Sequence, residues 1–237
     1  IAAFDGAGVR ERCKIMIGGG QIDETVRAYT GADAYGVNAV EAVALFQPDL
    51  IVAPFLKRAI PEAVWRDRVC LVVHPGIPGD RGPSALDWAI MNSEAEWGVT
   101  VLQANAVMDG GDIWATRSFP MRAARKSSLY RNEVTEAATA AVLEAVEKFE
   151  RGNFKPTPLD HANPAVRGSE RPLMKQIERR VDWSRDDTAT VLRKLRASDS
   201  FPGPSSRVAA EDCTSGRDAR ASAARTAVFA FGPDARS

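Results

Sequence analysis

The stretch VCLVVHPGIPGDRGPSALDWAI, residues 69–90, decides the predicted fold. It opens with a continuous apolar run, 69–74, of the kind found in strands that are covered on both faces. A loop rich in glycine and proline follows His74. The segment 84–92 then has the apolar spacing of a helix that begins at Ser84. A buried strand, a tight loop and a helix in this order are typical of one unit of an α/β sheet.

Toward the N-terminus, predicted strands and helices continue to alternate. The run PDLIVAPF, 48–55, predicts a second buried strand, and IPEAVWRD, 60–67, a short helix that leads from it into 69–74. This alternation predicts an α/β fold with a Rossmann-like parallel sheet flanked by helices. The earlier predicted elements are short strands at 13–19 and 32–36, a helix over 23–31 with Asp23 as its N-cap and Gly31 as its stop, and a helix over 38–46 capped by Asn38.

Toward the C-terminus, the pattern changes twice. The segments 97–105 and 111–121 predict two strands joined by a tight turn, and 128–152 predicts a long helix that completes a first domain, 1–150. A Pro/Asn/Gly-rich linker, 151–172, follows. We then expect the start of a small second domain at 173–203, whose helix over 179–199 is capped by Asp182 or Ser184, and a disordered tail at 204–237.

Composition excludes several classes of protein. The 237 residues carry 31 basic and 31 acidic side chains, so bulk charge favours neither nucleic acid nor an anionic membrane as a partner. No apolar run approaches the roughly 18 residues that a membrane span needs. The three cysteines, Cys13, Cys70 and Cys213, form no CxxC motif, which predicts neither a disulfide framework nor a metal site. The chain opens without Met and without a signal-peptide pattern, so we expect a fragment of a cytoplasmic protein.

Few residues can carry acid–base chemistry, because the chain has only two histidines, His74 and His161. His74 follows a buried strand, at the sheet edge where ligands of α/β folds bind. It can serve as a general acid or base, or it can simply bond to backbone at the strand end. Asp109 and Asp112 flank two glycines that would let a ligand approach closely, although such residues often only shape a turn.

The loop and helix start at 75–90 offer a second functional feature. Backbone N–H groups at the start of a helix suit an anionic or carbonyl oxygen. An ordinary strand-to-helix connection would have the same composition.

Together, the runs VVHPGIPGDRGPSALDWAI and WGVTVLQANAVMDGGDIW resemble the formyl-tetrahydrofolate-dependent formyltransferase superfamily. That superfamily includes methionyl-tRNA and glycinamide ribonucleotide formyltransferases. The resemblance implies that His74 stabilises the tetrahedral oxyanion formed when a nucleophile attacks the formyl carbon. It also implies that Asp109 holds His74 charged and helps to move a proton. It assigns the donor, formyl-tetrahydrofolate, to Pro54, Phe55, Leu56, Pro75, Gly82, Val101, Gln103, Gly110 and Asp112.

One departure separates this chain from the wider superfamily. Val72 stands where most members have an asparagine, two residues before the histidine, that donates to the formyl oxygen. With this replacement, residues 45–203 resemble the formyltransferase part of the HoxX hydrogenase-maturation family. That resemblance implies transfer of the formyl group to coenzyme A or a related pantetheine thiol, as the first step of carbon monoxide supply for nickel–iron hydrogenase. It further implies hydrogenase-maturation proteins as partners.

The N-terminal segment resembles something else. Residues 13–43 are similar to the end of a corrinoid-binding domain, in which a Gly-Gly turn after the strand lines the nucleotide groove. Gly18, Gly19 and Gly20 also fit an ordinary glycine-rich strand-to-helix turn, or the ligand-lined loop after the first strand of a formyltransferase. The Asp-x-His-x-x-Gly motif that would ligate cobalt does not occur upstream. We interpret 1–44 as a graft that supplies the first two strand–helix units of the sheet.

Several functional hypotheses stay open at this stage. The first is an enzyme that transfers a formyl group to a thiol or amine. The second is a non-catalytic folate-binding remnant, which Val72 favours, and a third is a formyltransferase of the methionyl-tRNA type. The fourth, a corrinoid-binding module, depends on residues 13–43 alone.

Overall fold

The computed structural model describes residues 6, 8, 10–12, 15–18, 23–36, 39–56, 59–164, 166–198, 203–207 and 226–228. Its centre is a four-stranded sheet in the order β3-β4-β5-β6. Strand β3 (Leu50–Pro54) pairs in parallel with β4 (Val69–His74), through a crossover that contains α4 (Glu62–Trp65). Strand β5 (Glu96–Gln103) is antiparallel to β4, and β6 (Ile113–Pro120) is antiparallel to β5.

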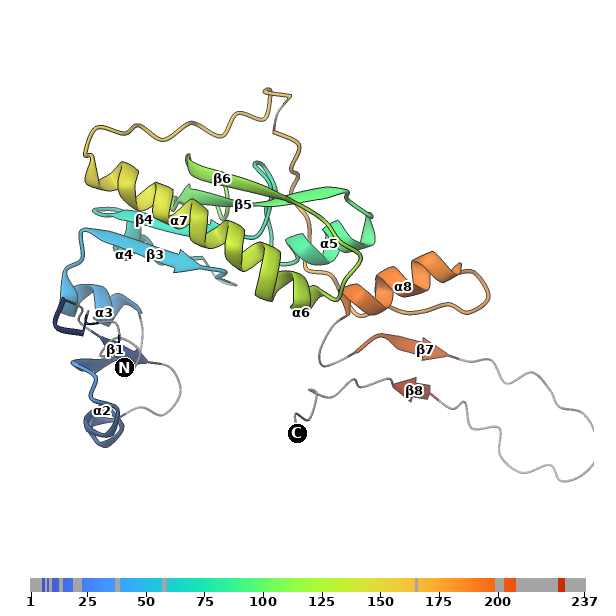
Figure 1. Ribbon diagram of the computed structural model, residues 1–237, viewed down its shortest axis with the longest axis horizontal. Coiled ribbons are helices and arrows are strands. Elements are labelled where there is room, and N and C mark those ends of the chain that lie inside the picture. Colours follow the sequence, from blue (N-terminus) through green and yellow to red (C-terminus); the bar gives the residue numbers. More distant parts are fainter. Residues whose placement is uncertain are drawn as a thin grey trace, which may run out of the picture.

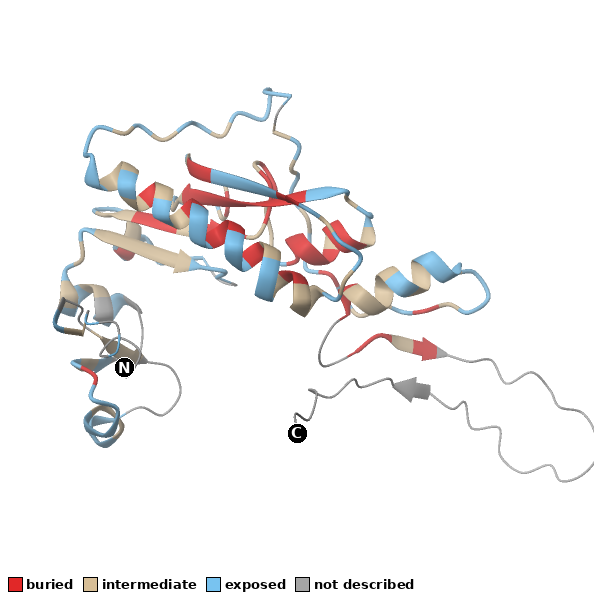
Figure 2. Ribbon diagram, in the orientation of Figure 1, coloured by how far each residue is buried: buried red, intermediate tan, exposed pale blue. Residues whose placement is uncertain are grey.

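Helices cover this sheet (Figure 1). The long helix α7 (Thr135–Glu150) packs on β5 and β6, and it follows α6 (Lys126–Leu129) through a π-helical turn. Helix α5 (Ala85–Met91) connects β4 to β5 and packs against α8 (Thr188–Ala197). The buried residues gather on β4, β5, α5 and the inner side of α7 (Figure 2), which is where the apolar runs of the sequence predicted a core.

The predicted α/β class is confirmed, with one correction to the sheet. Parallel pairing within the central sheet joins β3 and β4 only, because β5 and β6 form the hairpin that the tight turn predicted. The first two strands do not extend this sheet as we expected. Strands β1 (Met16–Gly18) and β2 (Ala34–Gly36) pair with each other in a separate parallel sheet.

In the N-terminal unit, the helix after β1 packs loosely. Helix α2 (Glu24–Thr30) contributes no buried residue, and Tyr29 is 92% exposed. Its ends still match the sequence. Asp23 accepts a hydrogen bond from the backbone N–H of Val26, and Gly31 takes the left-handed conformation that ends the helix. Helix α3 (Ala39–Phe46) follows, and the predicted cap Asn38 lies outside the described residues.

The second half corrects two predicted boundaries. Helix α8 begins after Asp187, whose carboxylate caps it, since Asp182 instead closes a turn with the backbone and hydroxyl of Ser184. Within the predicted tail, β7 (Ser205–Arg207) and β8 (Thr226–Val228) form an antiparallel pair. Ser206 also bridges to Val181, which gives that strand a neighbour in the folded part. The rest of 208–237 lies outside the described residues.

One prediction concerns Cys70 in β4. Its side chain is fully buried, and burial raises the pKa of the thiol to about 11. Since the thiolate is the reactive form, we expect a Cys13→Ser/Cys213→Ser protein to react with a disulfide reagent at pH 8 at least about 100-fold more slowly when native than in urea. Rapid labelling of the native protein would show that β4 is open to solvent.

Candidate functional site

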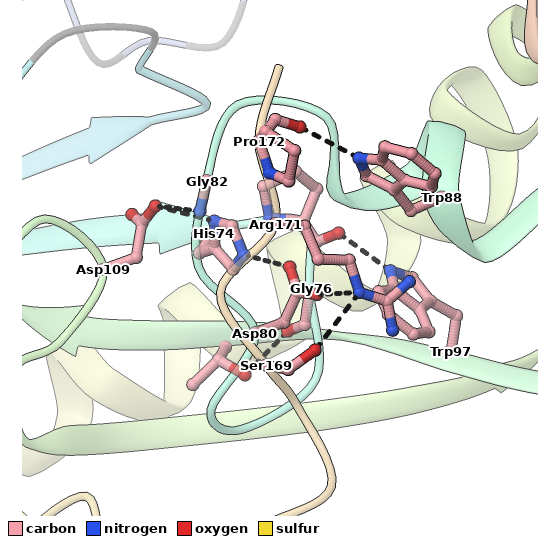
Figure 3. Close-up of polar contacts among 12 residues, drawn as sticks. His74, Gly76, Asp80, Gly82, Trp88, Trp97, Asp109, Ser169, Arg171 and Pro172 are labelled. Carbon is pink, nitrogen blue, oxygen red and sulfur yellow. Dashed lines mark hydrogen bonds and ion pairs between the residues drawn. The ribbon is translucent and has the colours of Figure 1, made fainter. Parts of the chain in front are cut away.

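The two predicted catalytic residues lie together at the carboxyl end of β4. His74 is the last residue of that strand and is 4% exposed. Asp109 lies in the turn between β5 and β6, at a φ of 53°. Its Oδ2 lies 3.5 Å from His74 Nδ1 and accepts a hydrogen bond of 3.2 Å from the backbone N–H of Gly82. The turn therefore aims the carboxylate at the histidine (Figure 3).

A third residue, which the sequence analysis missed, binds His74 more closely. Asp80 Oδ1 lies 2.9 Å from His74 Nε2, and Asp80 is 1% exposed. The loop after β4 turns back on itself there, since the Asp80 N–H donates to the carbonyl of Ile77 and Gly79 has a φ of 87°. The imidazole is thus flanked by a carboxylate on each side, with Asp80 on the buried side. The sequence feature that could have identified Asp80 is its position as an acidic residue in the glycine- and proline-rich loop after His74.

The loop is held from outside by residues 166–174, which we call the strap. These residues belong mostly to the predicted linker, yet they run along the loop (Figure 3) and bond to it repeatedly. The Arg81 N–H donates to the Ser169 carbonyl, and the Arg171 N–H donates to the Arg81 carbonyl. The Met174 N–H donates to the Ser84 hydroxyl. A Cβ on Gly168 would lie 1.8 Å from Asp80 N, so only glycine fits this crossing.

A small cleft opens beside the His74–Asp109 pair. Val72 and Leu102 lie opposite each other in the β4–β5 register, and both side chains line the cleft. The rest of its wall is mainly apolar and comes from the segment after β3 and from the turn that carries Asp109. These remaining lining residues are Leu56, Ala59, Ile60, Gln103, Ala104, Asn105, Val107, Met108, Asp109 and Gly111.

Of the residues predicted to hold a folate donor, Leu56 and Gln103 line this cleft. Val101 does not, because it pairs with Val73 on the opposite face and both are in the core. Because side chains alternate along a strand, the next residue, Leu102, faces the cleft.

The other predicted donor-binding residues surround the cleft without lining it. Phe55 contacts Tyr130 edge-to-face, and the Pro75 carbonyl accepts from the Trp97 indole. Gly110 donates to Val107 within the turn, and the Asp112 side chain is exposed. Pro54 is exposed at the end of β3 and Gly82 bonds to Asp109.

Two further findings apply to the part of the chain that the structure describes. It contains no helix long and apolar enough to cross a bilayer. It also contains no group of three or more His, Cys, Asp or Glu side chains arranged to hold a metal ion.

Known proteins resemble this chain in sequence and in fold. The hydrogenase maturation factor HoxX of Bradyrhizobium diazoefficiens is 58% identical over 163 residues, which is 69% of this chain and 28% of HoxX. A methionyl-tRNA formyltransferase of Desulfotalea psychrophila is 31% identical over 167 residues, which is 69% of this chain and 50% of that enzyme. The crystal structure of HypX from Aquifex aeolicus in complex with tetrahydrofolic acid superposes with a TM-score of 0.69 and 50% identity. That match covers 82% of this chain and 36% of HypX.

This chain therefore spans half or less of the length of each of these relatives. The family description "Formyl transferase" matches residues 19–146, which is more than half of the chain and includes most of the segment that resembles a corrinoid-binding domain. With this match, the likeness to HoxX and HypX, and His74 and Asp109 side by side at a cleft, the chain belongs to the formyl transferase family.

Proposed function

We propose that this chain transfers a formyl group from formyl-tetrahydrofolate, and that the cleft beside His74 receives the donor. The observation that carries the proposal is the contact between His74 Nδ1 and Asp109 Oδ2, at 3.5 Å, on the wall of an apolar cleft. An apolar pocket with a few convergent polar groups is the usual form of a small-molecule site. The likeness to HypX crystallised with tetrahydrofolic acid supports the choice of donor.

The proposed reaction is attack by a nucleophile on the formyl carbon. The new bond to carbon forms, the carbonyl oxygen becomes an oxyanion, and the bond to the folate nitrogen then breaks. With a proton on both ring nitrogens, His74 would donate from Nδ1 to the oxyanion while Nε2 stays bonded to Asp80. Asp109 would take the proton of the nucleophile and return it to the departing nitrogen.

The side chain of Val72 gives the cleft an apolar group in place of a hydrogen-bond donor. It lines the cleft where the wider family has an asparagine donor, and loss of one such donor costs roughly 100-fold or more in rate. Gln103 and Asn105, which also line the cleft, carry the amide groups that could replace it. Folate binding without turnover, the remnant hypothesis, is the second candidate for this reason.

For the acceptor, we propose the thiol of coenzyme A or a related pantetheine, in the supply of carbon monoxide during nickel–iron hydrogenase maturation. The likeness to HoxX supports this role and, with it, hydrogenase-maturation proteins as partners in the cytoplasm. Methionyl-tRNA is the alternative acceptor. The likeness to a methionyl-tRNA formyltransferase supports it, at a lower identity than the likeness to HoxX. A balanced charge of 31 basic and 31 acidic residues offers no general attraction for tRNA.

The test is turnover of formyl-tetrahydrofolate with coenzyme A and, separately, with methionyl-tRNA. We expect formyl-coenzyme A from the unaltered chain and a loss of about 100-fold or more in His74→Ala, because the oxyanion donor is gone. His161→Ala is the matched control, since this second histidine is exposed and distant in sequence.

Equal rates in wild type and His74→Ala would overturn the catalytic proposal. Tight tetrahydrofolate binding with no turnover in either protein would instead favour the remnant. If product forms with methionyl-tRNA but not with coenzyme A, the chain is a formyltransferase of the methionyl-tRNA type.

A further inference from the structure

We propose that Asp80 and Arg171 are positioning residues for the reaction, and that together they orient the His74 ring from the side opposite Asp109. The inference rests on the proposed function for its kinetic consequence, but its geometry stands apart from it. Arg171 lies in the strap, outside the family match at 19–146. The catalytic unit would then include a segment that the family match leaves out.

Asp80 determines which way the histidine faces. Its Oδ1 lies 2.9 Å from His74 Nε2, and both side chains are almost completely buried. A carboxylate bonded to one ring nitrogen fixes the orientation of an imidazole. With Nε2 held in this way, Nδ1 is directed toward Asp109, at the wall of the cleft.

A buried carboxylate needs compensation, and Arg171 provides it. Asp80 Oδ2 is buried and has no hydrogen-bond partner among the described residues. Arg171 Nε lies 3.7 Å from this oxygen, on a side chain that is 17% exposed. Without an opposite charge nearby, burial of the carboxylate would be strongly unfavourable. Arg171 thus lets Asp80 remain the acceptor for His74 Nε2.

Arg171 is itself held in a fixed direction (Figure 3). Its guanidinium lies over the Trp97 ring, 5.6 Å from the ring centre, and its Nε lies 3.4 Å from the Ser169 hydroxyl. Its backbone N–H donates to the Arg81 carbonyl. The neighbouring strap residue Glu170 differs, because it is an exposed partner of Arg81 and does not approach His74.

The matched comparison is therefore Arg171→Gln against Glu170→Gln. Both variants remove one ion pair between the strap and the loop, but only the first touches Asp80. We expect Arg171→Gln to lower kcat by about 10- to 100-fold, the range seen when a group that orients a functional histidine is lost, with KM for formyl-tetrahydrofolate within about twofold. Glu170→Gln should leave kcat unchanged, and Arg171→Lys should restore part of it.

A spectroscopic readout separates orientation from folding. The chain has two histidines, so ¹⁵N-histidine labelling gives one imidazole signal set for His74 and one for His161. We expect the His74 Nε2 resonance to shift in Arg171→Gln and in the near-isosteric Asp80→Asn, and to stay in place in Glu170→Gln. Asp80→Asn serves alone if Arg171→Gln does not fold.

Wild-type kcat and an unshifted His74 spectrum in Arg171→Gln, or in Asp80→Asn, would overturn the inference. If the wild type has no turnover, the proposed function fails, and the spectrum still decides whether Asp80 and Arg171 orient the ring.

Discussion

Gly76→Ala is expected to abolish formyl transfer without removing any functional group. A Cβ at this position would lie 2.4 Å from His74 Nε2 and 2.7 Å from Asp80 Oδ1, where nothing can yield without separating the two. The Gly76 carbonyl also accepts from the buried Thr100 hydroxyl, so the backbone there cannot simply move away. Because a small displacement of a catalytic group costs about 100-fold in rate, we expect at least that loss.

The measurement is turnover of formyl-tetrahydrofolate together with the ¹⁵N signal of His74. Gly6→Ala is the control, since an added Cβ there meets nothing within 4 Å. Unchanged turnover in Gly76→Ala would mean that the buried contact between His74 and Asp80 is not needed for the reaction.

Trp97→Ala is expected to lower the free energy of unfolding by about 3–5 kcal/mol, the usual range for removal of a large buried aromatic side chain. Trp97 is fully buried in the core on β5, and its indole N–H donates to the Pro75 carbonyl at 2.9 Å. Its ring also supports the guanidinium of Arg171. The substitution would therefore loosen the loop after His74 as well as the sheet.

Urea unfolding followed by circular dichroism measures this effect without depending on the tryptophan signal. Trp183→Ala is the matched control, because Trp183 is 54% exposed and its removal should change stability by no more than about 0.5 kcal/mol. Similar destabilisation in both variants would contradict the assignment of Trp97 to the core.

Local sequence predicted those parts of the fold that depend on neighbouring residues. Asp23 and Gly31 bound α2 as their residue types indicate, because capping involves contacts only a few positions apart. His74 and Asp109 were predicted to act together from a family resemblance, and the pairing of β4 with β5 brings the ends of these strands together. The proximity of His74 and Asp109 thus depends on strand pairing, which the spacing of residues in the sequence does not show.

Contacts between residues far apart in the chain could not be predicted from the sequence. Asp80 gains its role from Arg171 and the strap, and no local pattern connects residues so far apart. The sequence did not distinguish Val101, which lies in the core, from Leu102, which lines the cleft, because a strand that is apolar on both faces does not show which face meets the cleft. The separate pairing of β1 with β2 also has no local sequence pattern, because the choice of a strand's neighbour depends on contacts between distant residues.

The strap also affects the order in which parts of the chain fold. Ser84 and Met174, which it joins, lie 90 positions apart, and closing a loop of that length costs roughly 4 kcal/mol of chain entropy beyond a constant. During synthesis, β3 to β6 and α7 leave the ribosome before the strap does. We therefore expect the sheet to form first and the surroundings of His74 last. In the finished protein, detachment of the strap alone would expose Asp80 while the sheet stays folded, so local opening and loss of function are coupled at a lower free energy than global unfolding.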